Sequence, residues 1–176
     1  FSGNEASLGG GIYNVNSASP TITNCEITDN KAVGSGGGML NQNNSSPVII
    51  NTLFSLNFAD NGGGLFNDAN SSSTIINSTF TENTVINNGA AIFNANSNPS
   101  VINTIIWNNT ANGVTTSSSA SIFNNISTPS ISYSLVANSG GSANWDTSAG
   151  SDGGNNIDTD PQFTNSANGD FSLSFG

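Results

Sequence analysis

The stretch "GGGMLNQNNSSPVIINTLFSLN" (Gly36 to Asn57) places three consecutive glycines directly before short runs of apolar, β-prone residues. Similar stretches begin at Gly9, Gly62 and Gly89, so the starting points lie 27, 26 and 27 residues apart. A fifth, less regular copy begins at Ser119. A fixed period of this length is typical of repeat proteins, in which each repeat buries its apolar face against its neighbours.

Each copy contains three β-prone patches separated by turn-forming residues. In the copy that begins at Gly36, these patches are Met39-Leu40 and the residues around Ile49 and Phe54. The patches are too short for ordinary helices and are rich in β-branched and aromatic residues. We therefore predict an all-β fold, a right-handed parallel β-helix of about five rungs. Each rung would have 26–27 residues and three short strands, with equivalent strands stacked about 4.8 Å apart.

The glycines and asparagines of the repeat are expected to form its corners. Gly11, Gly38 and Gly64 stand just before the first patch, where a corner needs close backbone approach or positive φ. Asparagine tolerates the left-handed backbone conformation, and stacked amides can hydrogen-bond along a coil. We interpret the asparagines between the second and third patches as an internal ladder, comprising Asn24, Asn51, Asn77 and Asn103. Two further columns end the third patch (Asn30, Asn57, Asn83, Asn109) and the first patch (Asn14, Asn41, Asn67, Asn94, Asn124).

The repeat stops after Val136, which divides the chain into two parts of one domain. Residues 1–138 are predicted to form the rungs, and residues 139–176 an irregular excursion followed by a C-terminal capping segment. Apolar residues in that segment are available to cover the end of the coil, namely Ile157, Phe163, Phe171, Leu173 and Phe175. Phe1 aligns with the end of a rung, so the first rung is incomplete, and we expect the chain to be a segment of a longer protein.

The charge of the chain excludes several classes of partner. It has eleven acidic residues, one lysine and no histidine, for a formal net charge of −10. Nucleic acids and anionic membrane surfaces require clustered basic residues, so neither is expected as a partner. No apolar run approaches the ~20 residues that a membrane-spanning helix needs. Cys25 is the only cysteine, and we expect its small side chain to point inward and to be buried.

The sequence offers little for catalysis. Nucleophilic catalysis with a histidine base is excluded within this segment, and a lyase would need a basic residue beside a carboxylate. Lys31 has no second base near it. Three carboxylates near the C-terminus, Asp152, Asp158 and Asp160, leave three alternatives open: turn formation, a Ca²⁺ site of oxygen ligands, or acid catalysis. We expect no cofactor, with Ca²⁺ as the alternative, and treat the chain as more consistent with a non-enzyme.

Trp107 stands where the preceding copies carry Thr81 and Ser55, at an outward position of the third patch. An exposed indole ring could stack on a sugar. The alternative is that Trp107 packs beneath a loop.

The motifs Gly10-Gly11-Ile12-Tyr13-Asn14 and Asn24-Cys25-Glu26-Ile27-Thr28-Asp29-Asn30 resemble the repeats of polymorphic outer-membrane proteins and of secreted right-handed β-helix proteins of the bacterial cell surface. The tail from Asn155, "NNIDTDPQF", and "GDFSLSFG" from Gly169 are similar to the end of the β-helix in anchored surface proteins. The resemblance implies an extracellular or cell-surface location. We therefore expect a non-catalytic segment of a larger surface or filament-forming protein, acting as an adhesin stalk or scaffold. The alternative is a carbohydrate-active enzyme or polysaccharide-binding module whose site lies largely outside this segment. Expected partners are polysaccharides, other surface proteins, or further copies joined end to end.

Overall fold

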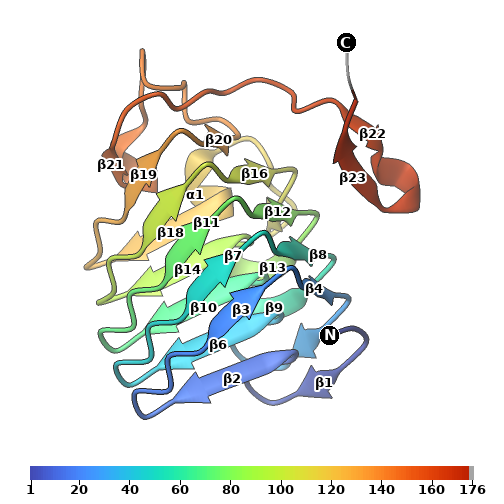
Figure 1. Ribbon diagram of the computed structural model, residues 1–176, viewed down its shortest axis with the longest axis vertical. Helices are drawn as coiled ribbons and strands as arrows, with labels where there is room; N and C mark the ends of the chain where they lie inside the picture. The colour runs from blue at the N-terminus through green and yellow to red at the C-terminus, as the bar shows by residue number, and fades with distance from the viewer. Residues whose placement is uncertain (175–176) are drawn as a thin grey trace.

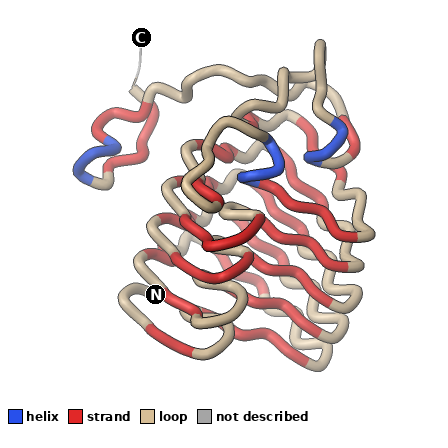
Figure 2. The backbone as a smooth tube through the Cα atoms, turned by 180° about the vertical axis from the view of Figure 1, so that it is seen from behind, coloured by secondary structure: helices blue, strands red, loops and turns tan. Residues whose placement is uncertain are grey.

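The computed structural model describes residues 1–174 and shows a parallel β-helix of about five turns, with the C-terminal part of the chain laid across one end and down one side (Figure 1). Four parallel sheets run along the coil, and each turn contributes one strand to each sheet. Figure 2 shows the chain closing one turn after another, with short loops between the strands.

The sheets are named here after their middle strands. The β9 sheet contains β1 (Glu5–Ala6), β5 (Lys31–Ala32), β9 (Phe58–Asn61), β13 (Thr84–Asn88) and β17 (Thr110–Ala111). The β10 sheet contains β2 (Ile12–Val15), β6 (Met39–Gln42), β10 (Leu65–Asp68), β14 (Ile92–Ala95) and β18 (Ile122–Asn125). The β11 sheet contains β3 (Thr21–Thr23), β7 (Val48–Ile50), β11 (Thr74–Ile76), β15 (Ser100–Ile102), β19 (Ser130–Ser132) and β21 (Ser151–Asp152). The β12 sheet contains β4 (Glu26–Thr28), β8 (Leu53–Ser55), β12 (Thr79–Thr81), β16 (Ile105–Trp107) and β20 (Leu135–Val136).

The predicted β-helix is confirmed, but each rung has four strands rather than three. The strands of the β9 sheet were missed because their inward side chains are small and leave little hydrophobic pattern. These buried residues are Ala32, Ala59, Val85 and Ala111. Their size has a packing reason: a Cβ added to Gly37 would lie 2.6 Å from the backbone oxygen of Phe58 in β9. The glycine run and this strand therefore meet backbone to backbone, with no room for large side chains.

The core is a narrow column of apolar side chains along the coil axis. In the β11 sheet, Ile75 pairs in register with Ile49 below and Val101 above. In the β12 sheet, the rings of Phe54 and Phe80 stack with centroids 4.5 Å apart. All five side chains are buried, as the predicted inward positions require.

The glycines before the β10 sheet form corners with positive φ or close backbone approach, as the sequence predicted. Gly36 adopts φ of 72°, and a Cβ added there would lie 2.6 Å from the backbone oxygen of Met39. At Gly38 a Cβ would lie 2.6 Å from the oxygen of Gly64 in the next rung. Both positions therefore exclude larger residues for reasons of space, and Gly36 also for its conformation.

A buried asparagine ladder follows the end of the β12 sheet. The ladder consists of the buried residues Asn30, Asn57, Asn83 and Asn109, and the exposed Asn4 donates to Asn30 at its N-terminal end. In its middle, the Asn57 amide donates to Asn83 Oδ1 at 2.9 Å and to the backbone oxygen of Ile27 at 2.8 Å. Asn57 Oδ1 accepts from both the backbone N–H and the side chain of Asn30. Each interior member thus has its polar atoms satisfied while it ties a bend to the rungs on either side.

A second buried ladder lies at the β10 sheet, and rows of hydroxyls complete the polar interior. Its buried members Asn14, Asn41, Asn67 and Asn94 each donate to the next member, and the half-buried Asn124 at the end donates to the backbone oxygen of Ser148. At the turn after the β11 sheet, hydroxyls accept hydrogen bonds from backbone N–H groups of the neighbouring rung; these residues are Ser78, Thr104 and Ser134. The coil is therefore held by side chains at its corners as well as by its sheets.

The column Asn24, Asn51, Asn77 and Asn103 is not internal, and this prediction was wrong. All four residues have positive φ, between 48° and 54°, as expected for a bend, but all four side chains are exposed. The inward position at this corner belongs to the next residue along the chain. Thr52, for example, is buried and donates to the backbone oxygen of Ile50 at 3.0 Å. The left-handed residue turns its own side chain to solvent.

Cys25 occupies the position of Thr52 in the first rung, but it is only half-buried, contrary to expectation. Its thiol donates to the backbone oxygen of Thr23 at 3.4 Å, the same local bond that Thr52 makes. Thr52 has a rung on either side of it, whereas among the described residues Cys25 has a neighbouring rung on its C-terminal side alone. This difference accounts for the exposure of Cys25.

The C-terminal end of the coil is closed by residues other than the predicted ones. Ala149, in the short 3-10 helix η1 (Thr147–Ala149), is fully buried against the core, and Trp145 packs beside it. Beneath them lies α1 (Ser118–Ser121), a four-residue helix in a rung that is lengthened to 30 residues between Ile92 and Ile122. No helix within residues 1–174 is long and apolar enough to cross a membrane.

The last segment forms an arm that runs back along the coil. It contains the antiparallel pair β22 (Phe163–Asn165) and β23 (Asp170–Leu173), joined by the 3-10 helix η2 (Ser166–Asn168). Figure 1 shows this hairpin beside the β12 sheet rather than over the end of the coil. Phe163 and Phe171 meet edge to face, with centroids 5.4 Å apart. They, with Leu173, therefore belong to the side of the molecule, not to the cap, and Phe175 lies outside the described residues.

The buried ladder and the exposed row make a matched prediction. Replacement of Asn57 by Ala leaves the Asn30 N–H and the Ile27 carbonyl without their partners, and should lower the free energy of unfolding by at least about 2 kcal/mol. Asn51→Ala places alanine in the left-handed region and should cost about 1 kcal/mol, and Asn51→Gly less. Urea unfolding followed by circular dichroism measures the three values. Equal losses for Asn57→Ala and Asn51→Ala would contradict the assignment of the buried ladder.

Candidate functional site

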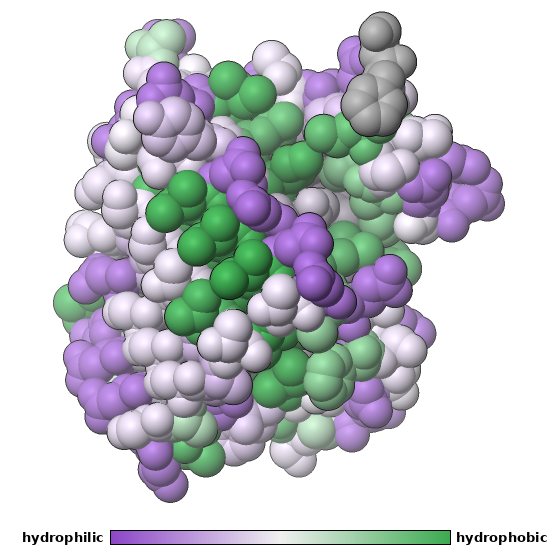
Figure 3. Space-filling model, viewed as in Figure 1, coloured by the Kyte–Doolittle hydropathy of each residue, from purple (hydrophilic) through white to green (hydrophobic). Residues whose placement is uncertain are grey.

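The exposed asparagine row forms one wall of a groove along the coil. The row lies at the corner between the β11 and β12 sheets, where Figure 3 shows a hydrophilic line running obliquely across the front face beside a hydrophobic band. Its side chains are joined in pairs. Asn51 donates to Asn24 Oδ1 at 2.6 Å, and Asn103 donates to Asn77 Oδ1 at 2.7 Å.

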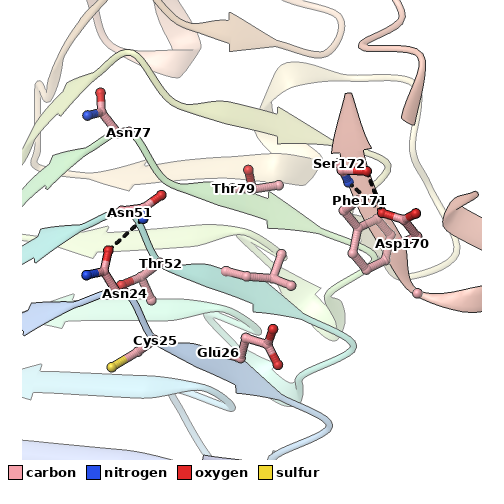
Figure 4. A pocket seen from close by; sticks show the side chains of 12 residues that line it. Asn24, Cys25, Glu26, Asn51, Thr52, Asn77, Thr79, Asp170, Phe171 and Ser172 are labelled. Atoms are coloured by element: carbon pink, nitrogen blue, oxygen red, sulfur yellow. Dashed lines mark hydrogen bonds between the residues drawn. The ribbon is translucent and has the colours of Figure 1, made fainter. Parts of the chain in front are cut away.

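The arm forms the opposite wall, and the outward residues of the β12 sheet form the floor. In the lower part of the groove, Asp170, Phe171 and Ser172 of β23 lie opposite the row, with Thr79 between the two walls (Figure 4). Leu53, which pairs in register with Thr79, also lines this part. This part has a volume of about 400 Å³.

The upper part is larger and more apolar. It has a volume of about 490 Å³ and is floored by Ile105 and Leu135, with Tyr133 at its rim. Asn77 and Thr79 line both parts, so the two hollows form one groove parallel to the coil axis. The groove combines amides, hydroxyls, an aromatic ring and an apolar floor.

Tyr133 takes the place of the row's fifth asparagine. It shares the left-handed conformation of the row, with φ of 51°, and its side chain is 62% exposed. The sequence contained this signal, since Tyr133 breaks the asparagine column in the fifth copy, but only the fold shows that the arm stands opposite it. Phe171 and Asp170 could not be assigned to the site from the sequence, because nothing local indicates where the arm lies.

Trp107 lies outside the groove. It is half-buried at the end of β16, in register with Thr81, and lines a hollow of about 210 Å³ with Gln162 and Phe163 of the arm. Of the two alternatives for Trp107, this position favours packing beneath a loop.

The three candidate calcium ligands hold turns and are not brought together. Asp158 accepts from the backbone N–H groups of Asn138 and Gly140, both at 2.9 Å. Asp160 accepts from the backbone of Gln162 at 2.8 Å. Within residues 1–174, no three side chains of His, Cys, Asp or Glu form a group that could hold a metal ion.

Asp152 likewise organises the loop that covers the coil. Its Oδ1 accepts from the backbone of Gly154 at 2.8 Å and from the side chains of Ser142 and Asn156. These hydrogen bonds, that of Gly154 first, hold the pKa of Asp152 below its ordinary value. The structure thus favours the turn-forming alternative for the acidic cluster.

The charges of the groove are all negative in the described part of the chain. Glu26 and Asp170 line its lower part and Asp160 its upper part. Hydrogen bonds from Ser172 lower the pKa of Asp170, so its carboxylate is ionised at neutral pH. The one lysine, Lys31, pairs with Glu5 at 3.0 Å in the β9 sheet, away from the groove. Acid–base chemistry here would therefore have no basic side chain among the described residues and would have to rely on the carboxylates, the Cys25 thiol or the Tyr133 hydroxyl.

Comparison with known proteins assigns the chain to a family. A family model described as "Right handed beta helix region" matches residues 1–127. The chain matches no curated protein and no solved structure. The matched region covers the asparagine row as far as Asn103 and ends before Tyr133 and the arm.

The cap should loosen in acid before the coil does. Hydrogen bonds from the Ser118 hydroxyl, and next from the backbone of Ser148, lower the pKa of Asp146. A carboxylate with a lowered pKa stabilises the fold above its ordinary pKa of about 3.9, and that contribution is lost as the pH falls below it. Trp145, whose indole donates to the Gly150 oxygen at 2.9 Å, reports on the cap.

In a Trp107→Phe variant, Trp145 is the only tryptophan. Its fluorescence should shift to longer wavelength below about pH 4, while far-UV circular dichroism still reports a folded coil. Adding Asp146→Asn should weaken the pH dependence. An emission spectrum unchanged down to strongly acidic pH would contradict the role of the cap carboxylates.

Proposed function

Because the chain belongs to the family of right-handed β-helix proteins, we propose that it serves as a non-catalytic structural scaffold, a stalk segment of a larger cell-surface or filament-forming protein. The fold itself is compatible with a structural segment or with a segment of an enzyme. The choice between a structural role and an enzymatic one depends on whether the recurring polar side chains hold the coil together or line a reactive site.

The observation that carries the proposal is the continuity of the buried ladders. Interior asparagines such as Asn57 and Asn83 have both their donors and their acceptor engaged within the coil. The most regular polar residues of the sequence thus hold successive rungs at a fixed spacing, which is the property a rigid spacer needs.

The proposal includes an extracellular or cell-surface setting. The resemblance of the repeats to those of secreted bacterial surface proteins is its basis. The outer surface is rich in Asn, Ser and Thr, and the net charge of −10 opposes non-specific association. Other surface proteins, or further copies joined end to end, are the protein partners that a stalk would have.

A scaffold of this kind should resist stretching and yield rung by rung. Each rung contacts only its neighbours, so single-molecule stretching between terminal handles should release the chain in discrete steps of about 90 Å. Asn83→Ala should lower the force of the steps, whereas Asn51→Gly, on the outer row, should leave it close to the parent value. Smooth extension without resolved steps would contradict a load-resisting role.

The alternative is a carbohydrate-active enzyme, favoured by one specific observation. Two carboxylates line the lower part of the groove, Glu26 from the β12 sheet at its floor and Asp170 from the arm, and glycoside hydrolysis uses a pair of carboxylates. A screen of neutral and acidic polysaccharides for newly released reducing ends tests it. The scaffold proposal expects no turnover; turnover abolished by Glu26→Gln and by Asp170→Asn would replace it.

A further inference from the structure

Tyr133 is an exposed aromatic residue in a conformation that suits asparagine better. The corner forms there as it does one rung below: the backbone N–H of Tyr133 donates to the Gly154 oxygen, as that of Asn103 donates to Ser132. A bulky residue with positive φ is unfavourable, so the ring is present despite the local conformation rather than because of it. Leu56 and Ile126 share this conformation, but neither lines the groove. Among these three residues, only Tyr133 combines the unfavourable conformation with a place in the groove.

The amides beside Tyr133, which line the groove, carry hydrogen-bonding atoms that the described part of the chain leaves unused. Asn103 uses its Nδ2 to bind Asn77 Oδ1. In the described part of the chain, Asn77 Nδ2 and Asn103 Oδ1 have no hydrogen-bond partner. The pair thus offers a free amide NH2 group as donor and a free carbonyl oxygen as acceptor, and both are suited to hydroxyl groups.

The upper groove also has apolar surface. Ile105 and Leu135 form its floor, and the exposed side chains of Ile157 and Leu173 line it from the loop and the arm. A sugar ring has an apolar face of C–H groups and an edge of hydroxyls. The groove matches both, with Tyr133 and the floor for the face and the asparagine pair for the edge.

Charge and length narrow the ligand further. The carboxylates Glu26, Asp160 and Asp170 would repel an anionic polymer, and no cation lines either hollow. The groove continues past Asn77 to the lower pair of amides, Asn24 and Asn51, at a rung spacing of about 4.8 Å. Each sugar ring of an extended polysaccharide lengthens the polymer by a comparable distance. Successive sugars would therefore meet equivalent amides on successive rungs.

We propose that this groove binds an uncharged polysaccharide, with the ring of Tyr133 stacked on one sugar and the side chains of Asn77 and Asn103 hydrogen-bonded to its hydroxyls. The inference goes beyond the scaffold role and does not depend on it, because a stalk and an enzyme could equally carry such a site.

Tyrosine labelling gives a direct test in the unmodified sequence. The chain has only two tyrosines, Tyr13 and Tyr133, and Tyr13 lies on the β10 sheet, away from the groove. Protein labelled with ¹³C on its tyrosine rings is titrated separately with hexamers of β-1,4-glucose, β-1,3-glucose, β-1,4-mannose, β-1,4-N-acetylglucosamine and α-1,4-galacturonate. At least one uncharged hexamer should shift the Tyr133 signals and leave those of Tyr13 in place, and the galacturonate hexamer should shift neither. Unmoved Tyr133 signals with all four uncharged hexamers at millimolar concentration, or equal binding of galacturonate, would overturn the proposal.

Variants separate binding from folding. Tyr133→Asn restores the residue type of the row, so its Tm should equal or exceed that of the parent, while the Kd for the active hexamer should rise about tenfold or more. Tyr133→Phe keeps the stacking surface and should change Kd by less than about threefold. Tyr13→Leu, which copies Leu40 in the next rung, is the matched control and should leave Kd unchanged. Unaltered affinity in Tyr133→Asn would overturn the proposal. It would also be overturned if Tyr133→Asn and Tyr133→Phe lost affinity to the same extent and both had a lower Tm than the parent.

Discussion

The hydrogen bond between stacked asparagine side chains is the interaction on which the rest of this structure depends. A β-helix must bend its chain several times in every rung, and each bend leaves backbone N–H and carbonyl groups without a sheet partner. In the Asn57 rung, one buried amide satisfies the backbone N–H of Asn30 and the carbonyl of Ile27 as well as its own neighbours in the ladder. Unpaired, such groups would each cost about 1–3 kcal/mol, so the ladder permits bends inside a dry core.

The ladders also explain why so polar a sequence can fold with so small a core. The core is a column only one or two side chains wide, in which Phe54 stacks on Phe80 and Ile75 on Ile49. Where space is too narrow even for these, glycine backbones pack directly against the β9 sheet. Polar side chains that elsewhere would face water are here part of the interior, and they are satisfied because identical residues recur at identical heights.

Once the interior is held in this way, the outer face of the corners is free to vary. The exposed row of Asn24 to Asn103 supplies the same left-handed bends as any residue tolerant of positive φ would, yet its amides point outward. Tyr133 shows that the position accepts an aromatic ring. The arm then adds a second wall beside the β12 sheet, so a surface that is regular along the coil becomes a groove.

The sequence by itself determined the repeat, the inward apolar positions, the left-handed corners at Asn24 and its equivalents, and the three asparagine columns, because these depend on local conformation and on a period that recurs in every rung. It could not determine which column is buried, since Asn51 and Thr52 are neighbours and only the direction of the bend decides that Thr52 faces inward. It missed the β9 sheet because alanine gives little hydrophobic signal where backbone packing leaves no room for more. The cap and the arm also needed the tertiary structure. Trp145, rather than Phe171, packs against the end of the coil, and Phe171 faces Asn51 across the groove, through contacts between residues far apart in a part of the chain that no longer repeats.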